Sequence, residues 1–173
     1  MLKILPTTAI ILTLVAFAQH AKAATADMPF DDGWRFIKGD AADWASPSTD
    51  DSAWQSVDLP HDWSIAGPIA RDNPSGHAGG FFPAGVGWYR KTFDAPADWN
   101  GSRVVIEFDG SYQNTEVYLN GQKLGNHVSG FSPFDFDLTP HLKLGDRNAR
   151  QHHGVGGRQV DHRPGIGIVD LGR

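Results

Sequence analysis

Apolar and polar residues alternate in short runs along most of the chain, and turn-forming residues separate the runs. Trp88, Arg90 and Thr92 alternate with Tyr89, Lys91 and Phe93, and the same two-residue period returns at residues 104–109 and 134–138. A period of two is typical of strands with one buried face and one face toward solvent. No helical period is evident. We therefore predict an all-β domain with strands at residues 34–37, 88–93, 104–109, 117–119 and 134–138.

Turn signals support this prediction. Asn120-Gly121 follows the alternation at Val117 and Leu119 and fits a type I′ hairpin turn, which needs two residues of positive φ. Pro60 forbids a central strand in the aromatic-rich passage around residues 57–63. Short strands at a spacing of about 8–12 residues predict a β-sandwich or jelly roll.

The first 23 residues have the composition of an export signal. Lys3 precedes the apolar run at residues 9–18, and Ala21-Lys22-Ala23 fits a small-x-small cleavage site. The run is too short to span about 30 Å of hydrocarbon. We predict cleavage near Ala23 and a periplasmic or secreted protein.

Charge and cysteine content narrow the classes of partner. The formal net charge is −5, and loss of the two lysines of the leader makes it more negative. An acidic surface argues against nucleic acid or anionic lipid as a partner, so neither nucleic acid nor membrane is expected. The sequence has no cysteine, which excludes disulfides and thiolate chemistry. No cofactor motif is found.

Four motifs occur in an order and spacing that resemble a known family. They are VDLPHDW at residues 57–63, GWYRKTF at 87–93, FDG with EVYLNG at 108–121, and GNHVSGFSPFDFDL at 125–138. Residues 30–148 resemble the N-terminal sugar-binding domain of glycoside hydrolase family 2, which contains β-galactosidases, β-glucuronidases and β-mannosidases. The resemblance implies a galactose-binding-like β-sandwich (jelly roll).

The same resemblance implies where the chemistry of such enzymes lies. Their two catalytic glutamates are carried by a (β/α)8 barrel of about 250 residues, which a chain of 173 residues cannot contain. We therefore expect no catalytic residue here, and the resemblance implies two partners: a carbohydrate, namely a β-galactoside or related glycoside, and the catalytic barrel of a full-length enzyme. A stand-alone carbohydrate-binding module is the alternative.

The glycine-rich segment at residues 72–83 is the candidate site. It is poor in β-branched residues and predicts a long surface loop, a common place for function. The resemblance implies that this loop reaches the active site of the barrel, where an asparagine before proline can bond a sugar hydroxyl. Asn73 is that residue, with Asp72 and Phe82 as neighbouring candidates. A simple turn at Asn73-Pro74 is the competing interpretation, which we favour for an isolated chain.

Other polar and aromatic residues suit structural roles. We expect His61 and His127 to make hydrogen bonds within loops, and Asp135 and Asp137 to be solvated and to titrate normally. The tryptophans have two interpretations, an exposed sugar-stacking platform or a core. They are Trp44, Trp54, Trp63 and Trp88.

The family pattern stops after Asn148. Residues 149–173 are rich in glycine, arginine and histidine, and we predict a disordered tail that reflects a frameshift or premature stop. The sandwich would then lack its last strand and leave an unpaired edge near residues 104–108, with marginal stability. The potential metal ligands of the tail match no known spacing, so no metal site is expected. They are His152, His153, Asp161 and His162. The predicted organisation is a signal peptide (1–23), a sandwich (24–148) and the tail (149–173).

Overall fold

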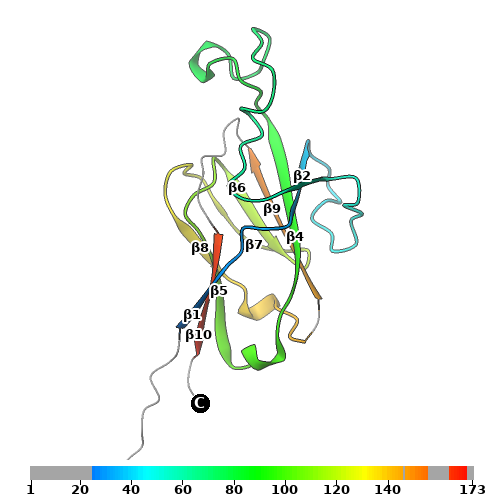
Figure 1. Cartoon of the computed structure of the whole chain (residues 1–173), viewed down its shortest axis with the longest axis vertical. Coiled ribbons are helices and arrows are strands. Elements are labelled where there is room, and N and C mark those ends of the chain that lie inside the picture. The colour runs from blue at the N-terminus through cyan, green and yellow to red at the C-terminus, as the bar shows by residue number, and fades with distance from the viewer. Residues whose placement is uncertain (1–24, 146, 156–163, 171–173) are drawn as a thin grey trace, which may run out of the picture.

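The computed structural model describes residues 25–145, 147–155 and 164–170, and side chains within 26–145. It consists of two antiparallel sheets with three short 3-10 turns and no α-helix in the described residues. The strands are β1 (Thr25–Pro29), β2 (Trp34–Lys38), β3 (Gln55–Val57), β4 (Val86–Asp94), β5 (Ser102–Phe108), β6 (Thr115–Leu119), β7 (Gln122–His127), β8 (Phe134–Asp137), β9 (Arg147–Val155) and β10 (Pro164–Asp170). The 3-10 turns are η1 (His77–Gly79), η2 (Ala97–Trp99) and η3 (Thr139–His141). Figure 1 shows the arrangement. The all-β class and the sandwich are confirmed.

Strand order fixes which ends of the strands meet. One sheet has the order β1-β10-β5-β8, and the other has the order β3-β2-β4-β9-β6-β7. The hairpin between β6 and β7 turns at Asn120 and Gly121, whose φ angles are 52° and 83°. Both values are positive, as a type I′ turn requires. The predicted hairpin is confirmed.

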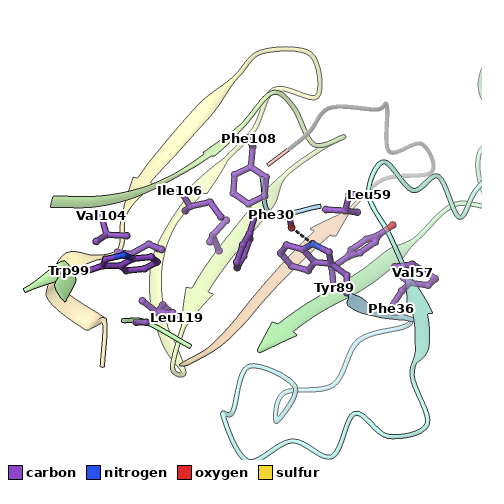
Figure 2. Packing of buried hydrophobic residues seen from close by; sticks show 14 of the residues in the cluster. Phe30, Phe36, Val57, Leu59, Tyr89, Trp99, Val104, Ile106, Phe108 and Leu119 are labelled. Atoms are coloured by element: carbon purple, nitrogen blue, oxygen red, sulfur yellow. Dashed lines mark hydrogen bonds between the residues drawn. The ribbon is translucent and has the colours of Figure 1, made fainter. Parts of the chain in front are cut away.

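The hydrophobic core lies between the two sheets (Figure 2). Ile106 of β5 comes from one sheet, and Val117 and Leu119 of β6 come from the other, and all three are fully buried. Trp34 is also fully buried, and its indole N–H donates to the carbonyl of Phe30 over 2.8 Å. Full burial of one such aliphatic or aromatic side chain contributes about 1.5–3 kcal/mol. The inward residues are those that the two-residue period selected.

The outer face of β4 differs from the expectation of a solvated face. Trp88 and Arg90 point away from the core but are 4% and 3% exposed. The segment between β2 and β3 covers them: Asp40 accepts a hydrogen bond from the Trp88 indole over 3.0 Å, and the Arg90 guanidinium donates to the carbonyls of Ser46 and Pro47. A covering loop therefore buries the outer face of β4 at Trp88 and Arg90, which strand periodicity cannot reveal.

The tail also differs from the expectation. Residues Arg147–Val155 form β9 between β4 and β6, and residues Pro164–Asp170 form β10 between β1 and β5. β5 is therefore paired on both sides, so the unpaired edge predicted near residues 104–108 is wrong. Strand pairing uses backbone N–H and C=O groups, which nearly every residue supplies whatever its side chain. The leader (1–23) and residues 156–163 lie outside the described part of the chain.

Candidate functional site

Three connecting segments meet at one end of the sandwich, which we call the loop end. Gly87 at the start of β4 and Thr115 at the start of β6 pair with the same residue of β9, so these two strands begin at the same level of the sheet. Thr115 also pairs with His127 at the end of β7. In the other sheet the end of β5 pairs with the start of β8. Residues 64–85, 109–114 and 128–133 therefore leave the sheets at this end. Figure 1 shows residues 64–85 projecting beyond the strands at the top of the view.

Residues 64–85 form an internally bonded loop. The N–H of Ala70 donates to the carbonyl of Phe81, so the stem of the loop is closed, and the N–H of Phe81 donates to the carbonyl of Gly76 over 2.9 Å. At the base, the buried hydroxyl of Ser64 donates to the carbonyl of Pro83 over 2.7 Å. Residues 70–81, whose ends are joined by the Ala70–Phe81 bond and whose backbone bonds to itself, have the character of an Ω-loop. The long surface loop that we predicted is confirmed.

Asn73 is the clamp of this loop. Its side-chain amide donates to the carbonyl of Pro68 over 2.8 Å and to the carbonyl of Phe81 over 2.7 Å. Both amide hydrogens are thereby used within the loop, which agrees with the turn interpretation. Its Oδ1 has no hydrogen-bond partner among the described residues. Asn73 can therefore meet a ligand only as an acceptor, and its contact with sugar stays a prediction.

The two neighbouring candidates have different surroundings. Asp72 is exposed beside Asn73. Phe82 is half-buried, and its carbonyl accepts a hydrogen bond from the Ser75 hydroxyl over 2.6 Å. A Cβ on Gly80 would lie 3.3 Å from the Phe82 ring, so this ring packs on the loop itself. The structure brings Asp72, Asn73 and Phe82 into one loop, and their role toward sugar stays a prediction.

The chain that leads to the loop is anchored on the core by His61. Nδ1 of His61 lies 2.9 Å from the hydroxyl oxygen of Tyr89, and its ring lies 4.9 Å from the Phe36 ring. Burial lowers the pKa of His61, an effect that the charge of Asp62 opposes. Burial raises the pKa of Tyr89, so this hydroxyl stays protonated at physiological pH. The structural role predicted for His61 is confirmed.

The two glutamates of the sequence are not placed to act together in glycoside hydrolysis. A retaining glycosidase needs two carboxyl groups about 5–5.5 Å apart. The only two glutamates of the sequence lie on opposite outer faces, Glu107 on β5 and Glu116 on β6, where Glu116 bonds Tyr118 and Lys123. Neither glutamate can therefore pair with the other across one cleft.

The expectation that Asp137 titrates normally is wrong. Burial raises its pKa, but hydrogen bonds from Thr139 and Arg103 outweigh that effect, so the pKa of Asp137 lies below its ordinary value. His127 behaves as predicted, since Nε2 lies 3.1 Å from the Ser132 hydroxyl.

The tryptophans belong to packed clusters. Trp54 and Trp63 are 5% and 8% exposed, and Trp44 packs edge-on against Trp54 and Trp88. Trp54, Trp63 and Trp88 are therefore buried and not an exposed platform, and Trp63 belongs to the core between the sheets. Trp44 is half-buried against Trp54 and Trp88. The exposed aromatic of the loop end is instead Phe131, which lies 5.3 Å from Tyr112 between ring centroids. Its position between Gly130 and Ser132, outside any alternating run, was the available signal.

Neither a metal site nor a membrane span occurs in the described residues. Where side chains are described, no group of three histidine or acidic side chains is placed to hold a metal ion. The described part likewise holds no helix long and apolar enough to cross a membrane. The side chains of His152, His153, Asp161 and His162 lie outside the described residues.

Comparison with known proteins gives the family. The sequence model described as "Glycosyl hydrolases family 2, sugar binding domain" matches residues 28–151. The chain belongs to glycosyl hydrolase family 2. Its relatives include the β-galactosidase BoGH2A of Bacteroides ovatus, 48% identical over 119 residues that cover 69% of this chain, and a putative β-glucuronidase of Formosa agariphila, 34% identical over 136 residues that cover 79%.

Solved structures of glycosidases share the fold. A family 2 member from Bacteroides cellulosilyticus has a TM-score of 0.77 and 34% identity, and a β-glycosidase from Bacteroides vulgatus has 0.77 and 33%. They cover 82% and 84% of this chain, which spans 20% of each of them. The chain spans 14% and 13% of the two curated relatives. The match thus corresponds to the family 2 sugar-binding domain, a small part of each relative.

Proposed function

We propose that this sandwich is the N-terminal sugar-binding domain of an exported, β-galactosidase-like family 2 glycosidase, and that residues 64–85 form one wall of the substrate cleft of that enzyme. The observation that carries the proposal is the closed loop at the loop end, whose backbone is bonded to itself and whose Asn73 keeps one free acceptor. A preorganised loop on a rigid sheet is well suited to hold a ligand contact. The relative BoGH2A, a β-galactosidase, supports the substrate class.

In this proposal the sandwich domain positions the substrate, and another domain carries out the chemistry. Glu107 and Glu116 are too far separated by the sandwich to act as acid and nucleophile. The catalytic carboxylates would belong to a barrel that follows the domain in the longer enzyme. Asn73 Oδ1 would accept a hydrogen bond from a sugar hydroxyl, which fixes the orientation of the ring.

A domain exchange tests the proposal. The matched segment of BoGH2A is replaced by residues 28–151 of this chain, and β-galactosidase activity is measured. We expect the chimera to remain active. Because Ala70 and Phe81 are already hydrogen-bonded, residues 71–80 can then be replaced by two glycines without moving the sandwich. The shortened chimera should fold with unchanged melting temperature but lose most of its kcat/KM. Equal activity of the two chimeras would refute the cleft-wall role.

Export forms a separate part of the proposal. Lys3, the apolar run at residues 9–18 and the Ala21-Lys22-Ala23 site support a cleaved leader. Mass spectrometry of the protein from the periplasm of an expressing bacterium should give a mature chain that begins at Ala24. An intact Met1 chain retained in the cytoplasm would contradict export.

A further inference from the structure

The most exposed large apolar side chain of the described residues lies at the loop end and outside loop 64–85. Phe131 is 75% exposed, and Val128, three residues earlier in the chain, is 63% exposed. The half-buried Tyr112 ring lies 5.3 Å from the Phe131 ring at an interplanar angle of 62°. The two rings thus form an open corner, which we call the Tyr112–Phe131 platform.

The Tyr112–Phe131 platform is held in place by close packing and hydrogen bonds. Gly130 is buried, and a Cβ at this position would lie 2.2 Å from the Tyr112 ring, so only glycine lets the two segments approach so closely. The N–H of Asn114 donates to the carbonyl of Val128 over 3.2 Å and joins the two segments. The N–H of Phe131 also donates to the Ser129 hydroxyl. An exposed ring that is held in place loses little conformational entropy when a ligand covers it.

The chemistry around the rings selects the class of ligand. Residues 109–115 and 126–137 contain asparagine, glutamine, serine and aspartate but no lysine or arginine. Amide, hydroxyl and carboxylate groups suit a ligand rich in hydroxyl groups, and neither segment supplies a lysine or arginine to attract an anion. The one histidine of these segments, His127, lies 3.1 Å from the Ser132 hydroxyl. An aromatic face suits the apolar C–H face of a pyranose ring. Neutral carbohydrate meets both conditions. Uronic acids and sulfated sugars have the same ring face and hydroxyl groups, but their negative charge would meet the exposed Asp109 and Asp135 with no lysine or arginine of these segments to offset it.

We propose that the Tyr112–Phe131 platform is a second carbohydrate contact, specific for neutral sugars and separate from loop 64–85. It rests on the proposed function only in taking carbohydrate as the ligand of the domain. A protein partner is less well supported, because a stable protein interface uses about 20–30 residues on each side. Phe131 and Val128 are the only large apolar side chains strongly exposed on these two segments.

Titration of the 173-residue chain followed by NMR tests the platform. The neutral probes are galactotetraose, cellotetraose and mannotetraose, and the anionic probe is trigalacturonic acid, each at millimolar concentration. Neutral probes should shift the amides of residues 109–114 and 128–133, and the anionic probe should not. Phe131→Ala and Phe131→Leu should weaken binding about tenfold or more, and Phe131→Trp should retain it. Asn73→Ala should leave these shifts unchanged.

Several results would overturn the platform. Equal binding by Phe131→Leu would show an unspecific apolar contact, and self-association that Phe131→Ala removes would show a second copy as the occupant. Stronger binding of trigalacturonic acid, or no shift in either segment with any neutral probe, would also refute it. Shifts confined to residues 64–85 and lost with Asn73→Ala would refute the platform while supporting the proposed function. An inactive domain chimera, together with normal sugar binding at the platform, would refute the proposed function while supporting the platform.

Discussion

The hydroxyl of Tyr89 and Nδ1 of His61 lie 2.9 Å apart, and this contact joins the chain leading to loop 64–85 to the middle of β4. Tyr89 is 2% exposed and belongs to the core, whereas His61 is half-buried and belongs to the connecting chain. The contact therefore ties the chain that leads to the candidate loop to the core of the sandwich.

The burial of His61 makes stability depend on pH. Burial lowers the pKa of His61 in the folded protein, while an unfolded chain titrates near 6.5. Between the two values the unfolded state binds more protons, so the free energy of unfolding falls as pH drops below about 6.5. We expect the stability advantage of the wild type over His61→Gln to shrink between about pH 7.5 and 5. Denaturant titrations at each pH measure it, and a constant advantage would contradict the account.

Arg90 is expected to be far more sensitive to substitution than Arg103. The Arg90 guanidinium is buried, pairs with Asp51 over 3.1 Å, and donates to two carbonyls. A lysine cannot reproduce this planar fork, so Arg90→Lys should lower the free energy of unfolding by about 2–4 kcal/mol. Arg103→Lys is the matched control, because the Arg103–Asp137 pair is 46% and 40% exposed and should cost less than about 1 kcal/mol. If chemical denaturation showed similar losses of unfolding free energy for Arg90→Lys and Arg103→Lys, the burial of Arg90 under the covering segment would be contradicted.

Gly130 should tolerate no side chain. The φ angle of Gly130 is not positive, so an alanine at this position would suffer no backbone strain. The expected cost comes from the clash of the alanine methyl group with the Tyr112 ring. Gly130→Ala should cost about 1–3 kcal/mol and change the near-ultraviolet circular dichroism of the aromatic pair. Ser129→Ala, which removes one exposed hydrogen bond, provides the comparison. A Gly130→Ala variant as stable as Ser129→Ala would contradict the packing.

Asn73 should control the order of its loop without controlling the sandwich. Asn73→Asp replaces two donors by acceptors that face the carbonyls of Pro68 and Phe81. Amide hydrogen exchange should therefore become faster at residues 70–82 and stay unchanged in β4 and β5. Protected loop amides in this variant would show that the clamp is not needed.

The sequence predicted those elements whose side chains alternate over a buried face. Val117 and Leu119 indicate β6, and Asn120-Gly121 indicates its turn, because local sterics alone set these features. The burial of Arg90 could not be predicted, since it depends on a segment more than 35 residues away. β9 and β10 were missed for a related reason: strands without an alternating pattern are held by pairing with their neighbours.

The candidate site was predicted only in outline. The glycine-rich composition indicated the loop, and the family resemblance selected Asn73. Its two amide hydrogen bonds depend on the folded path of the loop, which composition does not encode. Phe131 was overlooked because its position between Gly130 and Ser132, outside any alternating run, indicates a loop but does not show whether the ring is exposed or buried.

The central claim is that Asn73 at the loop end contacts the sugar, and kinetics of the active BoGH2A chimera test it most directly. Asn73→Ser keeps an acceptor oxygen and Asn73→Ala has none, while Asn100→Ala, exposed outside loop 64–85, serves as the control. We predict that Asn73→Ala lowers kcat/KM about tenfold or more, which is the size of effect expected from the loss of one hydrogen bond to a ligand. Asn73→Ser should recover part of this loss, and Asn100→Ala should leave kcat/KM unchanged. Unchanged kcat/KM in Asn73→Ala, with the chimera folded, would contradict the claim.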